Sequence, residues 1–77
     1  MKTPVTPVLL KNLRRYRRLT QAEASEAIGI SPRSCSDYEH GRRRVSLEIL
    51  IRFARLYDVS LDYLTGATLI RDVFPRF

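Results

Sequence analysis

The segment from Ser31 to Gly41 carries side chains whose types and spacing suit it for binding. Ser31 followed by Pro32 is typical of a helix start, because a serine hydroxyl caps free backbone amides and proline needs no amide partner there. At 100° per residue, Cys35 and Tyr38 fall on one face, which we expect to be buried. The opposite face is polar and can both donate and accept hydrogen bonds, through Arg33, Ser36, Asp37 and His40.

Positive charge gathers on both sides of this segment. Arg42, Arg43 and Arg44 follow it directly, and five of the eight residues from 11 to 18 are lysine or arginine, with no acid among them. Exposed helices usually interleave the two signs of charge. The chain has a formal net charge of +6 and a sequence pI near 10.3. These features favour a polyanionic partner, either nucleic acid or an acidic membrane surface, over a merely soluble basic domain.

The composition leaves little room for catalytic or metal chemistry. The chain has one cysteine, Cys35, and one histidine, His40, which fall on different faces of the same predicted helix. No internal disulfide or ordinary zinc site can be built from them, and no glycine-rich phosphate loop is present. We therefore predict no enzyme, no metal and no cofactor, and we interpret Cys35 as a small packed residue. The absence of a signal peptide or a bilayer-spanning run predicts a cytoplasmic location.

Local signals predict a single all-α domain of five helices. Thr20 and Glu23 form a capping box, and Gly29 is a suitable helix end. Ser46 and Ser60 are further N-caps. The predicted helices span residues 8–18, 20–28, 31–40, 47–57 and 61–65.

The helix predicted over residues 47–57 is apolar further round than a surface helix requires. Residues at i, i+3, i+4 and i+7 predict its core stripe, formed by Leu47, Leu50, Ile51 and Ala54 and widened by Phe53 and Tyr57. Ile49 and Leu56 are left as additional apolar side chains. These two side chains indicate that the helix has a second apolar surface, which another part of the protein or a partner has to cover.

The two ends of the chain differ in character. Pro4 and Pro7 predict that residues 1–7 form a flexible arm ahead of a domain at 8–66. Residues 67–77 are too apolar for a free disordered tail. We predict a homodimer interface made from the fourth helix, the fifth helix and this tail, with its apolar side chains at Ile49, Leu56, Leu69, Ile70 and Phe74. The alternatives are that the tail folds back over its own subunit or binds another protein.

Several motifs, in order and without insertions, resemble the Cro and phage-repressor type of helix-turn-helix domain, also called the XRE type. The resemblance covers roughly residues 8–66 and implies a five-helix, lambda-repressor-like fold. The matching residues are Leu13-Arg14, Leu19-Thr20-Gln21, Gly29-Ile30-Ser31, Glu39, Gly41-Arg42-Arg43, Ser46-Leu47-Glu48 and Val59-Ser60-Leu61-Asp62.

The resemblance also implies roles for individual residues. Arg14 and Glu39 match a pair that forms an internal salt bridge in the family. The positions that face DNA bases are Pro32, Arg33, Ser34 and Asp37, flanked by Ser36. The expected phosphate-binding residues are Gln21, His40, Arg42, Arg43 and Arg44, to which the basic first helix adds Arg17 and Arg18. Pro32 offers only apolar contact, and Asp37 can accept from a cytosine amino group but repels phosphate.

The sequence therefore predicts a sequence-specific regulator of transcription that binds double-stranded DNA. We expect a prokaryotic or phage repressor that acts as a homodimer at the nucleoid, with the third helix in the major groove. The main alternative is an antitoxin that binds a toxin through the tail at 67–77 and regulates its own promoter.

Overall fold

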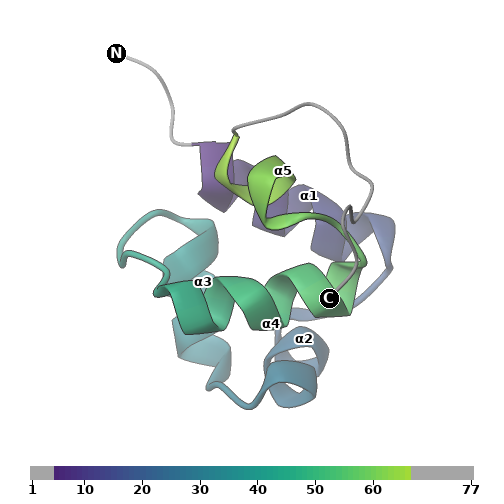
Figure 1. Ribbon diagram of the computed structural model, residues 1–77. Coiled ribbons are helices and arrows are strands. Elements are labelled where there is room, and N and C mark those ends of the chain that lie inside the picture. Colours follow the sequence, from purple (N-terminus) through teal and green to yellow (C-terminus); the bar gives the residue numbers. More distant parts are fainter. Residues whose placement is uncertain (1–4, 67–77) are drawn as a thin grey trace.

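The computed structural model describes residues 5–66, and all the regular structure within that range is helical (Figure 1). Residues 1–4 and 67–77 lie outside the described part. The five helices are α1 (Val5–Tyr16), α2 (Gln21–Ile28), α3 (Pro32–Glu39), α4 (Leu47–Tyr57) and α5 (Leu61–Thr65).

The helix boundaries follow the predicted caps closely. Thr20 accepts from the Glu23 amide at 3.0 Å, and the Glu23 side chain accepts from the Thr20 amide at 2.9 Å, which completes the capping box. Ser31, Ser46 and Ser60 each accept a backbone N–H in the first turn of α3, α4 and α5. These hydroxyls satisfy amides that have no partner inside their helix.

The first helix differs from its prediction at both ends. It begins at Val5, so residues 5–7 belong to α1 rather than to an arm. Pro7 is tolerated because it lies in the first turn, where an amide would have no intrahelical partner. The Thr6 hydroxyl also donates to the Leu64 carbonyl at 2.8 Å, which holds the start of α1 against α5. The helix ends at Tyr16 and not at residue 18, because Arg18 is left-handed, with φ of 57°.

Three aromatic rings form the centre of the core. Phe53 lies edge-on to Tyr38, with ring centroids 6.2 Å apart, and stacks on Tyr57 at 5.9 Å. The buried apolar side chains come from all five helices and the α4–α5 turn: Leu10, Leu13, Ala24, Ile28, Cys35, Tyr38, Phe53, Ala54, Tyr57, Val59 and Leu64. Cys35 is fully buried among them, as its predicted role as a packed residue requires.

The predicted core stripe of α4 was wrong at Leu47 and at Ile51, neither of which packs in the core. Leu47 is 66% exposed, and the buried face consists of Phe53, Ala54 and Tyr57, with Leu50 packed at its edge. Leu50, Phe53, Ala54 and Tyr57 have the same helical spacing, moved three residues toward the C-terminus. Because α4 is apolar almost all the way round, its sequence fits both phases, and only packing against other helices selects one.

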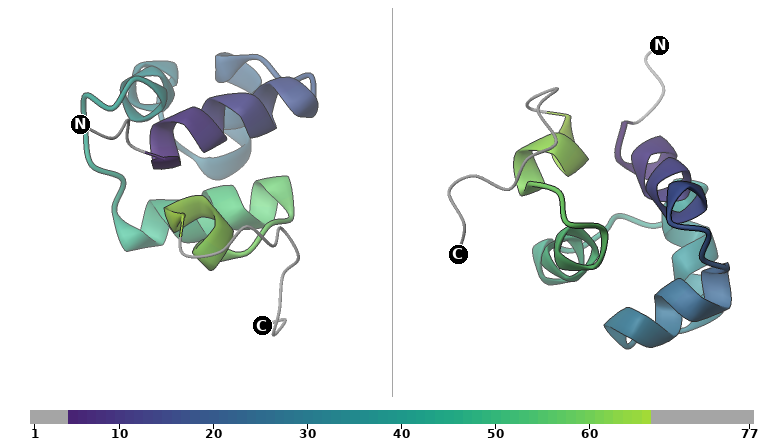
Figure 2. Two further views of the ribbon diagram at one scale, coloured as in Figure 1. Left: turned by 90° about the horizontal axis from the view of Figure 1, so that it is seen from above. Right: turned by 90° about the vertical axis from the view of Figure 1, so that its right-hand side faces the viewer.

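The helices surround this core so that α3 lies at one side of the molecule. In Figure 1, α4 crosses the front, with α1 and α5 side by side above it and α2 below. The right-hand view of Figure 2 looks nearly along α4 and places α2 and α5 at opposite ends of the molecule. α2 packs on α3 and α4, and α1 packs across α3. α3 is therefore held from behind by two helices.

Candidate nucleic-acid interface

The α2–α3 turn fixes the direction in which α3 presents its polar face. Gly29 adopts φ of 75°, and its amide donates back to the end of α2. Its left-handed conformation is strained for other residues, which explains glycine at this position. Ser31 and Pro32 then start α3 after only a few residues. The two helices are thereby joined by a short turn with little freedom.

A shallow hollow of about 460 Å³ lies along the outer face of α3. It brings together residues from the start of α2, the face of α3 and the loop after it. The lining residues are Gln21, Pro32, Arg33, Ser36, Asp37 and Arg42. All six were predicted from the sequence as base-facing or phosphate-binding residues, and the fold places them around one surface.

The candidate base-facing residues differ in how free their side chains are. Arg33 is exposed, and within residues 5–66 its guanidinium has no hydrogen-bond or ionic partner. Ser34 accepts from the Arg43 guanidinium at 3.1 Å, and its hydroxyl lies 3.0 Å from that of Ser31. Arg33 is thus the long side chain on this face that is available to an external acceptor.

The arginine loop after α3 is partly folded back onto the helix. Arg42 lies 3.4 Å from the Asp37 carboxylate. The Arg43 guanidinium lies over the Tyr38 ring, 5.2 Å from its centroid, in a favourable cation–π position. Arg44 is exposed, with no side-chain partner among the residues that the structure describes. The three arginines therefore present one free and two positioned guanidinium groups.

His40 lies at the C-terminal end of α3, exposed to solvent. Its Nδ1 is 2.7 Å from the Ser36 carbonyl and 3.4 Å from the Ser36 hydroxyl. If Nδ1 carries the proton, the ring caps a carbonyl of its own helix, and Nε2 stays available on the outside.

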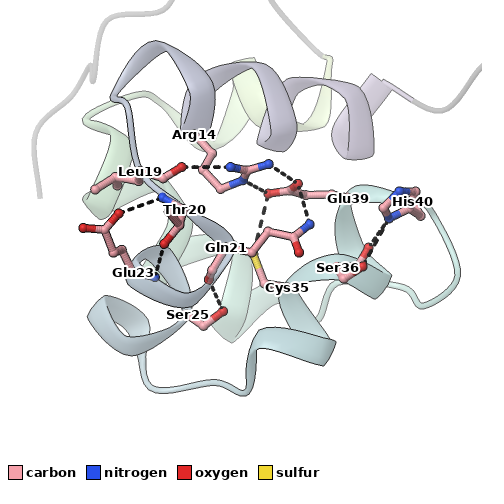
Figure 3. Close-up of polar contacts among 10 residues, drawn as sticks. All are labelled: Arg14, Leu19, Thr20, Gln21, Glu23, Ser25, Cys35, Ser36, Glu39 and His40. Atoms are coloured by element: carbon pink, nitrogen blue, oxygen red, sulfur yellow. Dashed lines mark hydrogen bonds and ion pairs between the residues drawn. The ribbon is translucent and has the colours of Figure 1, made fainter.

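Behind the polar face, Glu39 is the centre of a buried hydrogen-bond network (Figure 3). Its side chain is fully buried, and Arg14 Nε and Nη2 bind its two oxygens at 2.7 and 3.1 Å. Gln21 Nε2 donates to Glu39 Oε1 at 3.2 Å, and the Cys35 thiol lies 3.5 Å from Oε2. Arg14 also donates to the Leu19 carbonyl at 2.8 Å. Side chains from α1, α2 and α3 thus meet at one carboxylate.

The electrostatics of this network follow from its burial and its ion pair. Burial acts to raise the pKa of Glu39, but the bonds from Arg14 and Gln21 outweigh it and leave that pKa below its ordinary value. The hydrogen bond to Glu39 raises the pKa of Arg14. Burial, together with the nearby carboxylate, raises the pKa of the Cys35 thiol. The thiol is therefore protonated and poorly nucleophilic at neutral pH.

Two exposed arginines, Arg17 and Arg52, cap the C-terminal ends of other helices. Arg17, predicted to bind phosphate, donates to the Tyr57 carbonyl at the end of α4 at 2.9 Å. Arg52 donates to the Ile28 carbonyl at the end of α2 at 3.0 Å and binds Glu48 at 2.9 Å. Sequence reasoning missed both caps, because each joins residues more than twenty positions apart.

The predicted dimer residues fall into two groups. Ile49 and Leu56 are partly buried and pack against the core of the chain itself. Leu69, Ile70 and Phe74 lie outside the described residues.

No helix within residues 5–66 is long and apolar enough to cross a membrane.

Together, the short turn, the supported α3 and its polar outer face define a helix-turn-helix domain. The helix-turn-helix family model matches residues 10–64, so the chain belongs to this family. Its motifs are those of the Cro and phage-repressor type, as the sequence predicted.

Known relatives resemble most of the chain. The uncharacterized HTH-type transcriptional regulator YobD of Bacillus subtilis (strain 168) is 42% identical over 59 residues, which are 77% of this chain and 53% of that protein. Antitoxin PezA of Streptococcus pneumoniae (serotype 4) is 37% identical over 57 residues, 74% of this chain and 36% of that protein.

Among solved structures, the P22 c2 repressor in complex with a synthetic operator has the same fold. Its TM-score is 0.79 at 21% identity, over 86% of this chain and all of that one. The chain spans about half the length of the curated relatives it matches first.

Proposed function

We propose that this chain is a sequence-specific regulator of transcription that binds double-stranded DNA with α3 in the major groove. The observation that carries the proposal is the hollow along α3, where Arg33, Ser36 and Asp37 lie between the start of α2 and the arginine loop. A side chain that reads bases has to stand free on a supported helix, with cations beside it for the phosphates. Membership of the family and the names of the relatives support this proposal.

Direct readout falls mainly to Arg33. Its free guanidinium can bind O6 and N7 of a guanine together, which contributes about 1–3 kcal/mol of discrimination. Pro32 offers an apolar contact, for example to a thymine methyl group, and Ser36 offers a hydroxyl. Ser34 is already bound to Arg43, so it serves this surface by orienting a cation as much as by contacting a base.

Phosphate binding falls to the groups around the hollow. Arg44 and the two positioned arginines, Arg42 and Arg43, lie on one side, with His40 at the end of α3. On the other side is the N-terminus of α2, whose amides favour an anion. One N–H of the Gln21 side-chain amide is bound to Glu39, so its second side-chain N–H and its backbone amide remain as donors for a phosphate. Arg18 is exposed and adds positive charge, while Arg17 is engaged at α4.

We further propose that the protein acts as a homodimeric repressor in the cytoplasm, at the nucleoid, without enzymatic activity or a cofactor. A single helix reads only a few base pairs, and a two-fold dimer doubles the site. Ile49 and Leu56 on α4, with Leu69, Ile70 and Phe74 beyond the described residues, supply the apolar side chains for that contact.

Selection of bound sequences from a random duplex pool tests this function. We expect a two-fold symmetric motif with half-sites about 10–10.5 base pairs apart. The affinity should fall steeply as salt rises, because several phosphates are neutralised per subunit. A pool that shows no enrichment after several rounds would rule out sequence-specific binding.

The likeness to antitoxin PezA favours one alternative, an antitoxin that also binds its own promoter. In that case residues 67–77 would contact a toxin rather than a second copy of the chain. Sedimentation of the purified protein separates the two proposals. A stable dimer that loses its association when Leu69 and Phe74 are replaced by serine supports the homodimer, and a monomer unaffected by these changes supports the antitoxin.

A further inference from the structure

Asp37 occupies a position where two local effects disfavour a carboxylate. It lies in the last turn of α3, where the negative end of the helix dipole disfavours an acid. It also lines the hollow that we propose faces DNA, where it meets the phosphate field. Residues that oppose local preferences in this way often have a functional role.

The structure links Asp37 to Arg42 twice. The Arg42 amide donates to the Asp37 carbonyl at 2.9 Å, while the Gly41 amide donates to the Tyr38 carbonyl at 3.3 Å. With Gly41 at φ of 71°, these two bonds form a Schellman motif, which fixes the backbone of Arg42 relative to the end of α3. The Arg42 guanidinium then folds back to the Asp37 carboxylate at 3.4 Å.

The pair sits at the edge of the hollow and is unequal in exposure. The Asp37 side chain is only 16% exposed, whereas that of Arg42 is 60% exposed. One N–H of the guanidinium points toward Asp37, and the other four donors remain for an outside acceptor. The carboxylate therefore restrains Arg42 without blocking it.

We propose that Asp37 is a positioning residue that makes Arg42 selective for correctly placed phosphates. This inference rests on the proposed DNA-binding function. On a fitting site, the phosphate meets the outer N–H groups of an arginine that is already in place. On random DNA, α3 is not docked in the groove. The restrained Arg42 guanidinium then cannot follow the DNA backbone, and the Asp37 carboxylate repels the phosphates. Asp37 thus lowers non-specific binding more than it lowers specific binding.

Replacing Asp37 by asparagine should relax this discrimination. We expect Asp37→Asn to bind a random duplex about five- to tenfold more tightly at roughly 0.1 M salt, because it frees one cation for the backbone. The plot of log K against log salt should steepen by about 0.9, the value for one further phosphate contact. On the selected site the gain in affinity should be smaller than on random duplex, so the ratio of the two affinities falls.

A double-mutant cycle shows whether Asp37 acts through Arg42. The gain on random duplex should largely disappear when Asp37→Asn is made in an Arg42→Ala background. Glu26→Gln is the matched control, because Glu26 is an exposed acid on α2 with no side-chain partner within residues 5–66. Like Asp37→Asn, it removes one negative charge. It should give only the small gain in affinity for random duplex that remains in the double variant.

Equal gains from Asp37→Asn in both backgrounds would overturn the proposal, because Asp37 would then act by its charge alone. A loss of affinity for the selected site in both backgrounds would also overturn it, and would indicate direct contact between Asp37 and a base. Failure of the proposed function looks different: wild-type protein would then show no preference for any site over random duplex. An unchanged thermal midpoint of Asp37→Asn confirms that the fold is intact.

Discussion

Gln21 at the start of α2 donates its side-chain amide to Glu39 at the end of α3, at 3.2 Å. The same carboxylate accepts two bonds from Arg14 of α1. One buried acid thus connects the first residue of α2 to the last residue of α3. Because Gln21 also lines the outer hollow, the network behind α3 fixes the position of a residue on its front face.

Removing Arg14 should destabilise the fold strongly. Arg14→Ala leaves the fully buried Glu39 carboxylate with Gln21 as its main donor, and breaking one side of such a pair typically costs about 3–5 kcal/mol. Urea unfolding measures the change in the free energy of unfolding. Arg15→Ala is the control, because Arg15 is exposed and has no side-chain partner in the described range. A wild-type midpoint for Arg14→Ala would show that the ion pair is not structural.

The same network predicts a loss of stability in acid. The pKa of Glu39 is lower in the folded protein than its ordinary value of 4.5, so its contribution to stability is fully present above that value. It is lost as the pH falls through the folded pKa, because protonation then favours the unfolded chain. Unfolding in urea at pH 7 and near pH 3 measures this slope. Glu39→Gln should be less stable at pH 7 and should show a flatter dependence on pH below 4.5.

The local structure of this protein could be predicted from its sequence where neighbouring residues determine it. Thr20 with Glu23, Ser31 with Pro32, and Gly29 all act within one helical turn, and each is found where the sequence placed it. The start of α1 was wrong because the Thr6–Leu64 hydrogen bond joins residues far apart in the sequence. Its end was wrong because Arg18 closes the helix in a left-handed conformation, a position that glycine usually marks in a sequence.

The sequence could not predict which arginines are bound within the fold and which remain free on the surface. Arg17 and Arg52 look like other surface cations in the sequence, yet each binds a helix-end carbonyl on another element. Gln21 was expected to bind phosphate, and its partner Glu39 is eighteen positions away. Spacing along one helix indicates which residues share a face, but only the fold decides which of them are already occupied.

The left-handed residue that ends α4 offers a site for stabilisation. Asp58 has φ of 53°, a conformation that costs a residue with a side chain about 1–2 kcal/mol and glycine very little. Asp58→Gly should therefore raise the free energy of unfolding by about 0.5–1 kcal/mol, since the freer unfolded chain offsets part of the gain. Asp58→Ala retains the strain and is the matched control. Thermal melts should rank glycine above alanine, and the reverse order would refute this interpretation.

Two exposed arginines should affect DNA binding in different ways. Arg33→Ala removes the proposed guanine contact, so the affinity for the selected site should fall by about 1–3 kcal/mol and the preference at one base pair should relax. Arg44→Ala removes a proposed phosphate contact, so specific and random duplexes should lose affinity alike, and the salt slope should decrease by about 1. Titrations of both duplexes at several salt concentrations measure these effects. If Arg33→Ala instead weakened both duplexes equally and left the base preference unchanged, Arg33 would be a phosphate-binding residue, and the readout would have to come from other side chains around the hollow.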